Sequence, residues 1–384
     1  MLSTSNSKIS GNDQFWQFPE MIKISLLVFI ILIVAGCRNK PERNSSRMNH
    51  GKELVLNLMP GADNPRNSEG DFITLKDGRI LFIYSHYTGS SANDHANAYL
   101  AGRYSSDNGE TWSEKEVKIV EQEGKMNVMS VSLLRLQNGE IAFFYLRKNS
   151  VTDCIPYLRI SKDEAKTWSN PQPCIINKVG YFVLNNNRVI QLKNGRLLFA
   201  VALHQSPGEK DATDAGRIWS YYSDDNGKSW TAGEEVSNPG SIVTQEPGMV
   251  ELNNGEILMF LRTRSGVQYF SYSKDKGKTW SAVEPGNIKS PCSPASITRI
   301  PSTGDLLLVW NDNGVDQKRT PFNIAISKNE GKTWINKKIL EDNPFGSFCY
   351  PAVHYVNNEL LLSYYNWTTL GSVIVKLDTD WMYK

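Results

Sequence analysis

The chain has 384 residues, of which 40% are hydrophobic and 21% are charged, and its formal net charge is +2. This length and composition are sufficient for a sizeable buried core. So small an excess of positive charge excludes a general basic surface for nucleic acid, and any preference for anions must come from a few placed residues.

The first predicted element is an export signal. Residues 21–37 read MIKISLLVFIILIVAGC, with one lysine, an apolar run, small residues and then Cys37. The apolar run is short and ends abruptly, which is typical of a secretory signal rather than a membrane span. The ending VAGC resembles the bacterial lipobox. This resemblance implies cleavage before Cys37, lipid attachment to its thiol and export to the bacterial cell envelope; the alternative is an uncleaved N-terminal anchor.

Residues 1–20 are atypical of a segment that precedes a signal, so we predict Met21 as the true start within a signal region of residues 1–37. Residues 38–51 are polar and are predicted to form a flexible tether.

Residues 52–384 are predicted to consist of repeated β-hairpins. Six segments consist of two apolar runs around a short polar turn, several of them with Asp-Gly or Asn-Gly, the strongest short-range hairpin signal. The turns are marked by Gly78, Gly139, Gly195, Gly255, Gly304 and, in the sixth, Glu359.

Each of the first five hairpins is followed by a turn close to Ser-x-Asp-x-Gly-x-Thr-Trp. These turns begin at Ser105, Ser161, Ser223, Ser273 and Ser327, at intervals of 50 to 62 residues. We expect their Ser and Asp side chains to cap backbone N–H groups, Gly to supply positive φ, and Trp to pack between blades, which is architecture rather than catalysis.

A unit of two hairpins contains four antiparallel strands. The sequence therefore predicts an all-β fold, a six-bladed β-propeller of four-stranded antiparallel blades. The early strand at residues 52–58 is expected to pair with the last blade and close the ring, which would leave no exposed sheet edge.

The turns resemble the Asp boxes of the sialidase (neuraminidase) superfamily, and the similarity covers residues from about 54 to the C-terminus. Asp boxes also occur in unrelated secreted propellers, so the functional inference depends on the active-site positions. That family uses three arginines, an acid/base Asp, a Glu and a nucleophilic Tyr.

The resemblance is stronger in the second half. Glu246 and Arg262 stand at the two ends of one hairpin, sixteen residues apart, as the family's Glu and second arginine do; Arg264 is a second candidate. Arg319 precedes the last Asp box, at the place of the third arginine. Tyr350, 31 residues further on, takes the place of the nucleophile.

In the first half, Arg66 is the one arginine between residue 52 and the first hairpin, and Asp94 lies 28 residues beyond it in a polar loop, followed by His95. The resemblance implies that Arg66 binds substrate and that Asp94 is the acid/base; His95 would line the pocket or be structural.

The chain departs from the family pattern at the last hairpin. The family has there a Glu that orients the first arginine, whereas this chain has Tyr365 and Asn366. Glu69, three residues after Arg66, is the candidate replacement. The preferred acidic sugar depends on this difference.

These assignments imply a retaining exo-α-sialidase-like glycoside hydrolase that removes a terminal sialic acid, or a related 2-keto sugar acid, from glycans. Three guanidinium groups suit the substrate carboxylate. That carboxylate would repel a carboxylate nucleophile, whereas a neutral phenol avoids the repulsion. Glu246 would accept the proton of Tyr350, and Asp94 would protonate the leaving oxygen. No metal or organic cofactor is expected.

Two alternatives remain open: a propeller enzyme on another acidic sugar, as a uronate lyase or hydrolase, and a glycan-binding lipoprotein without turnover. A lyase would need an acid/base pair such as Tyr and His near an Arg, to which His95 and residues 147–150 could contribute. In every case the expected partners are sialylated or other acidic glycans and, through the lipid anchor, a membrane. We expect a monomer that binds no nucleic acid.

Two further expectations concern parts of the propeller. Residues 127–132 and 182–187 are candidate walls of the sugar pocket. Four cysteines lie downstream of Cys37: Cys154, Cys174, Cys292 and Cys349. Their spacing fixes no disulfide pairing, although a disulfide is possible in an exported protein, and it indicates no metal site. Buried free thiols are the default prediction.

Overall fold

A computed structural model describes residues 51–210 and 213–384. The predicted signal region, its start at Met21, the lipidation residue Cys37 and nearly all of the predicted tether lie outside these residues. Within the described ranges, no helix is long and apolar enough to cross a membrane.

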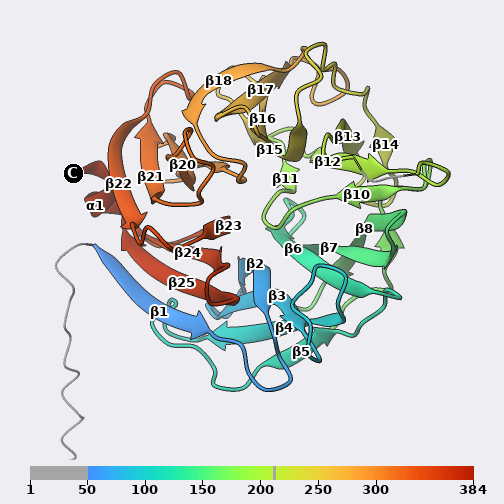
Figure 1. The fold of residues 1–384 in the computed structure, drawn as a ribbon. Coiled ribbons are helices and arrows are strands. Elements are labelled where there is room, and N and C mark those ends of the chain that lie inside the picture. Colours follow the sequence, from blue (N-terminus) through green and yellow to red (C-terminus); the bar gives the residue numbers. More distant parts are fainter. Residues whose placement is uncertain (1–50, 211–212) are drawn as a thin grey trace, which may run out of the picture. The chain divides into compact units, whose positions relative to one another are not determined.

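The described residues are almost entirely β-structure, and their sheets follow one another around a central axis (Figure 1). In this part of the chain the one helix is α1 (Thr379–Tyr383). Four of the sheets have four antiparallel strands each. With strands in spatial order, the first of these sheets has β2 (Asn67–Thr74), β3 (Ile80–Tyr87), β4 (Ala98–Ser105) and β5 (Val117–Val120), and the second has β15 (Thr244–Glu251), β16 (Ile257–Thr263), β17 (Val267–Ser273) and β18 (Glu284–Lys289). The third has β19 (Ser296–Arg299), β20 (Leu306–Asn311), β21 (Phe322–Ser327) and β22 (Ile335–Glu341). The fourth has β1 (Lys52–Leu58), β25 (Gly371–Asp378), β24 (Glu359–Asn366) and β23 (Phe348–Val356).

The fifth sheet has nine strands and corresponds to two of the predicted blades. Its strands are β6 (Asn127–Arg135), β7 (Ile141–Ser150), β8 (Asp153–Ser161), β9 (Gln172–Pro173), β10 (Tyr181–Val183), β11 (Ile190–Gln191), β12 (Leu197–Gln205), β13 (Arg217–Ser223) and β14 (Thr231–Ala232). The two halves join where β10 pairs in parallel with β8 through Tyr181 and Cys154. The all-β prediction and the four-stranded unit are thus confirmed, but the described residues form five sheets rather than six. The reason is that the single parallel pair between β8 and β10 joins two predicted blades into one sheet. Within it, the inner strand of the third predicted blade is broken into β10 and β11, which both pair with β12.

The first and last strands of the ring belong to one sheet, as predicted. β1 pairs with β25 in antiparallel register from Lys52 opposite Leu377 to Leu58 opposite Ser372. Buried apolar side chains then join this sheet to the next one, because Leu58 and Ile374 belong to the same hydrophobic cluster as Phe72. The ring is therefore held by strand pairing inside one sheet and by side-chain packing between sheets.

The Asp-box turns have the predicted architectural role. In the first, Ser105 Oγ accepts a hydrogen bond from Gly109 N at 2.9 Å, and Asp107 Oδ1 accepts one from Thr111 N at 2.9 Å. Gly109 has φ +86°. Trp112 packs against the cluster shared by the first and last sheets. The Ser105 and Asp107 side chains are thus held by hydrogen bonds within the turn, which leaves neither of them free for catalysis.

We expect Gly109→Ala to lower the free energy of unfolding by roughly 1–3 kcal/mol, because the new methyl group would be strained at positive φ and overpacked. A Cβ there would lie 2.7 Å from Leu361 Cδ2. Urea unfolding measures the loss. Gly78→Ala is the matched control, since Gly78 also has φ +86° but a Cβ would meet nothing within 4 Å. Equal losses in the two variants would mean that the contact with Leu361 contributes nothing.

Candidate active site

Four inner strands carry a β-bulge in which a residue other than glycine has positive φ. The register shifts between Ser68 and Asp71 in β2, Met129 and Ser132 in β6, Gln245 and Gly248 in β15, and Cys349 and Ala352 in β23. The residues with positive φ are Glu69 (49°), Ser130 (59°), Glu246 (45°) and Tyr350 (55°). Such a backbone costs about 1–2 kcal/mol per residue for an L-amino acid. Bulges that re-aim side chains are typical of functional sites.

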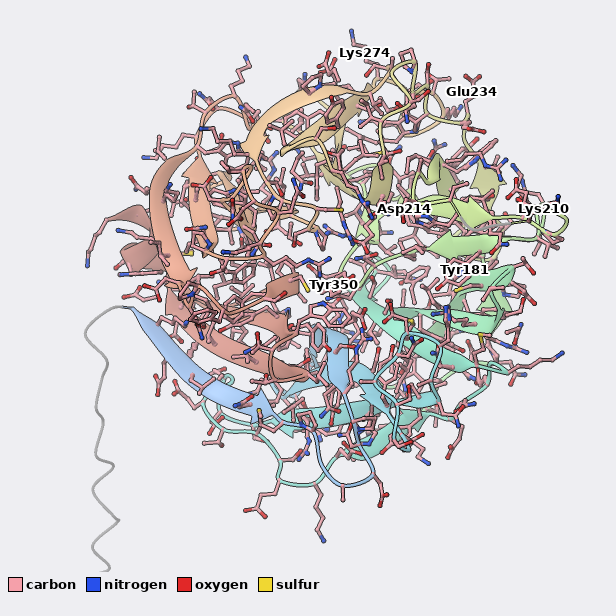
Figure 2. All side chains as sticks on the ribbon, viewed as in Figure 1. Tyr181, Lys210, Asp214, Glu234, Lys274 and Tyr350 are labelled. Atoms are coloured by element: carbon pink, nitrogen blue, oxygen red, sulfur yellow. The ribbon has the colours of Figure 1, made fainter. Side chains whose placement is uncertain are left out.

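Two of these bulges bring Tyr350 and Glu246 together. Tyr350 Oη donates a hydrogen bond to Glu246 Oε1 at 3.1 Å, and Arg262 Nη1 lies 2.6 Å from Glu246 Oε2. The hairpin explains the contact between Arg262 and Glu246. Gln245, the residue before Glu246, pairs with Arg262 across β15 and β16, so Arg262 lies next to Glu246. Tyr350 lies near the middle of the ring (Figure 2).

The charges in this cluster favour an ionised Glu246 and a neutral Tyr350. Burial opposes the ionised carboxylate, but the guanidinium groups of Arg262 and Arg319 outweigh it, so the pKa of Glu246 is below its usual value. Burial, and then the Glu246 charge, raise the pKa of Tyr350 well above its usual value, and the two arginines only partly offset this. The phenol therefore keeps its proton in this state, beside a carboxylate able to accept it.

Arg319 completes this first cluster, and its partners include two cysteine residues. Its Nη1 donates to Cys349 Sγ at 3.1 Å and its Nη2 to the backbone oxygen of Cys292 at 3.3 Å. Arg262 Nε donates to Cys292 Sγ at 3.2 Å. All four described cysteines are free. Cys154, Cys174 and Cys349 are buried, as predicted, whereas Cys292 is only partly buried.

Arg66 forms the centre of a second cluster. Its side chain is fully buried, with Nη2 3.1 Å from Glu69 Oε2 and Nη1 paired with Asp94. Glu69 is the predicted replacement for the Glu that the family has at the last hairpin, and in the structure its carboxylate lies against Arg66. Asn366 instead accepts a hydrogen bond from Thr368 N at 3.0 Å within a turn.

Three aromatic rings surround the Arg66 guanidinium. Its Cζ lies 4.6 Å from the ring centre of Tyr87, 4.9 Å from that of Tyr365 and 5.2 Å from that of Trp367. A planar cation is attracted to such rings. The last hairpin and the turn after it thus present the aromatic rings of Tyr365 and Trp367 to Arg66, whereas its buried carboxylate partner, Glu69, comes from β2.

Asp94 is half exposed and charged in this arrangement. Burial of its carboxylate opposes ionisation, but Arg66 outweighs it and lowers the pKa of Asp94. Two buried side chains from the nine-stranded sheet hold the loop: Lys148 Nζ donates to the Asp94 backbone oxygen at 2.7 Å, and Asn127 Nδ2 does so at 2.8 Å. From the sequence, Asn127 and Lys148 are candidates only as members of residues 127–132 and 147–150, because no local spacing indicates a contact with Asp94.

The remaining candidates lie outside both clusters. Arg264 is exposed and its Nη2 lies 2.8 Å from Asp214 Oδ2, so it does not join Glu246. His95 is exposed, with its ring centre 6.2 Å from that of Tyr181. Among the described residues, no group of three or more His, Cys, Asp or Glu side chains is arranged to hold a metal ion.

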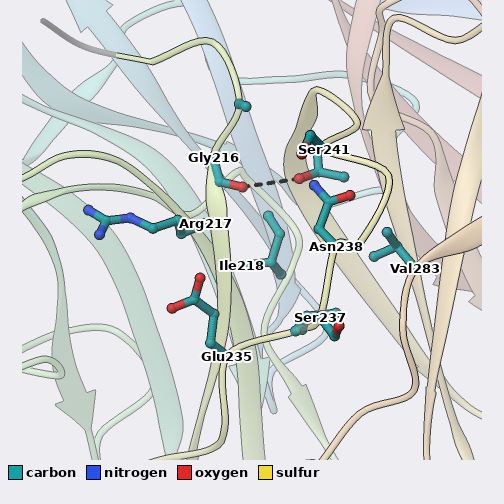
Figure 3. A pocket seen from close by; sticks show the side chains of 11 residues that line it. Gly216, Arg217, Ile218, Glu235, Ser237, Asn238, Ser241 and Val283 are labelled. Carbon is teal, nitrogen blue, oxygen red and sulfur yellow. Dashed lines mark hydrogen bonds between the residues drawn. The ribbon is translucent and has the colours of Figure 1, made fainter.

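A cavity of about 470 Å³ lies beside the start of β15 (Figure 3). It is lined by residues 215–218 and 235–238 together with Ser241, Thr244 and Val283. Thr244 Oγ1 donates to the Gly216 backbone oxygen at 3.0 Å across its wall. It contains none of the six predicted catalytic and substrate-binding residues.

Comparisons with known proteins concern the family and the fold of the chain. A family model described as BNR repeat-like domain matches residues 115–362, and one described as BNR/Asp-box repeat matches residues 103–114. A sialidase of Paraclostridium sordellii is 26% identical over 297 residues, which are 69% of this chain and 70% of that protein.

Two solved structures show the same fold. A Hadza microbial sialidase superposes with a TM-score of 0.67 at 18% identity, covering 82% of this chain and 66% of that one. An intramolecular trans-sialidase from Ruminococcus gnavus, solved with oseltamivir carboxylate, also gives 0.67, at 15% identity and with 85% and 98% coverage. At these identities the structures show the fold alone.

Proposed function

Because the chain belongs to the BNR repeat-like family within the sialidase superfamily, we propose that it is a retaining, exo-acting glycoside hydrolase that removes terminal sialic acid or a related 2-keto sugar acid. The observation that supports this best is the contact of Tyr350 Oη with Glu246 Oε1 at 3.1 Å, with Arg262 on the other carboxylate oxygen. Binding alone would need the arginines but not a phenol paired with a base.

In the first chemical step, Tyr350 Oη would attack the anomeric carbon. The new O–C bond forms as the phenolic proton passes to Glu246 and the bond to the leaving oxygen breaks. Arg66, Arg262 and Arg319 would hold the substrate carboxylate. In the second step, water attacks the same carbon, the bond to the Tyr350 oxygen breaks with its electron pair left on that oxygen, and Glu246 returns the proton to it. Two displacements at one carbon retain the configuration.

Asp94 would act as the acid in the first step and the base in the second. In the present structure it is charged and paired with Arg66. A substrate carboxylate would compete for that guanidinium. Binding of the substrate would therefore release Asp94 from Arg66, and Asp94 could then take up the proton that a general acid needs.

The test is the release of fluorophore from an aryl α-sialoside by the purified full-length protein, with the released sugar followed by proton NMR. We expect turnover and the α-anomer as the first product. A folded protein without turnover would overturn the sialidase assignment. Turnover only with a uronate-capped glycan would favour the alternative acidic sugar, and binding without turnover would favour the glycan-binding protein.

We also propose six blades, with the nine-stranded sheet counted as two of them. Five β-hairpins followed by Asp boxes, together with the final sheet, support this number. An experimental structure in which residues 127–232 form one continuous blade would contradict it.

We propose a lipid anchor at Cys37 from the lipobox-like ending VAGC. In a bacterial host, Cys37→Ala is expected to move the protein from the membrane fraction to the soluble envelope fraction or to block its processing. Radiolabelled palmitate reports the modification directly. Labelling and membrane retention that are unchanged in Cys37→Ala would refute the anchor.

A further inference from the structure

A buried asparagine lies between the two clusters and contacts both bulges. Asn186, in the segment between β10 and β11, is 2% exposed. Its Nδ2 donates to the Tyr350 backbone oxygen at 3.2 Å and to the Gly70 backbone oxygen at 2.9 Å. Tyr350 is the proposed nucleophile, and Gly70 directly follows Glu69. One side chain thus ties the strand of the Tyr350 cluster to the strand of the Arg66 cluster.

The bulges explain why these carbonyl groups need a donor from elsewhere. Gly70 lies within the register shift of β2, and Tyr350 within that of β23, so neither has a cross-strand register partner. Residues of a bulge are left without their ladder partner. A carboxamide nitrogen has two N–H groups, and Asn186 directs both of them to these two oxygens.

Tyr350 also needs external support for its backbone. Its φ of 55° is unfavourable for a residue with a side chain, and such a conformation persists only where the surroundings fix it. The direction of its ring, and so the position of Oη relative to Glu246, depends on that backbone.

We infer that Asn186 is a positioning residue: by holding the Tyr350 carbonyl in the bulge, it sets the distance between Tyr350 Oη and Glu246. The expected effect on kcat rests on the proposed function, whereas the effect of Asn186 on the position of Tyr350 Oη does not. Asn186 itself takes no part in proton transfer, since it contacts the two backbone oxygens and not the reacting atoms.

The next residue provides a matched control. Asn187 Nδ2 donates to Asp71 Oδ1 at 2.8 Å, and its Oδ1 accepts from Val353 N at 3.3 Å. It therefore ties the same two strands with the same chemical group. Residue 187 falls within the segment expected to line the sugar pocket, but both polar atoms of its side chain are directed to Asp71 and Val353 instead of to either cluster. These contacts fall on residues that follow Glu69 and Tyr350 and leave the Tyr350 carbonyl untouched.

The experiment compares Asn186→Ala with Asn187→Ala by hydrolysis of an aryl α-sialoside, thermal unfolding and affinity for 2-deoxy-2,3-didehydro sialic acid. Asn186→Ala should lower kcat by about 10²-fold, as expected for a reacting group misplaced by about 1 Å. KM and the Kd of the analogue should stay within about threefold of the wild-type values, because a change of that size is a small part of the free energy of binding. Asn187→Ala should lower the melting temperature comparably while kcat stays near the wild-type value. Equal losses of kcat in both variants, or unchanged kcat in Asn186→Ala, would overturn the inference.

A crystal structure of Asn186→Ala separates this inference from the proposed function, because it needs no turnover. We expect the Tyr350 backbone to leave the left-handed region and Oη to lose its hydrogen bond to Glu246. An unchanged Tyr350 would refute the positioning role even if the wild-type protein is an active sialidase. A wild-type protein without turnover would refute the enzyme assignment while this structure still decides the role of Asn186.

Discussion

Replacing Tyr350 with Phe is expected to lower kcat for an aryl α-sialoside by at least about 10³-fold, because the variant lacks the oxygen that would form the bond to the sugar. This corresponds to about 4 kcal/mol of transition-state stabilisation. The fold should survive, since the ring is kept and the lost contact is the single hydrogen bond to Glu246. Steady-state kinetics with the fluorogenic sialoside measure the effect, and mass spectrometry of a trapped glycosyl-enzyme locates the bond.

Tyr355→Phe is the matched control for this prediction. Tyr355 lies on the same strand, β23, and its hydroxyl contacts Thr298 Oγ1 at 3.2 Å, away from the arginines. Its kcat should remain within about twofold of the wild-type value, as for a residue that makes no contact in the transition state. Substantial activity in Tyr350→Phe, or a sugar attached to another residue, would exclude Tyr350 as the nucleophile.

The features that the sequence predicts well are those fixed by short stretches of chain. An Asp box is closed by contacts within the turn, as between Ser105 and Gly109, so its pattern is visible without the rest of the fold. The pairing of Glu246 with Arg262 is similar, because one hairpin sets the register of both residues. The assignment of Tyr350 required a family resemblance, since its partner Glu246 is 104 residues away.

The features that could not be predicted depend on contacts between distant segments. Asn186 reaches Tyr350 across 164 positions of the chain, and Lys148 reaches Asp94 across 54. Neither pair has a characteristic spacing, because each depends on how separate sheets meet near the axis. The nine-stranded sheet has the same origin, since a single parallel pair between β8 and β10 joins two units that the repeat pattern separates.

Replacing Arg66 with Met is expected to lower the free energy of unfolding by roughly 3–5 kcal/mol at pH 8, because it leaves Glu69 buried without its counter-ion. Glu69 is 5% exposed, and Arg66 is fully buried. Burial raises the pKa of Glu69 in the wild-type protein, and Arg66 is the largest opposing influence. Without Arg66, that pKa should rise further.

The sign of the pH dependence follows from this rise. A carboxyl group whose pKa is higher in the folded than in the unfolded protein favours folding fully below its unfolded value, and this contribution is lost as the pH rises through the folded value. The deficit of Arg66→Met should therefore be small near pH 5 and largest at pH 8, as measured by urea unfolding at both. The double variant Arg66→Met/Glu69→Gln should recover most of the loss at pH 8, because the uncompensated charge is gone. A deficit that is equal at both pH values and persists in the double variant would show that Arg66 stabilises the fold through its aromatic neighbours rather than through Glu69.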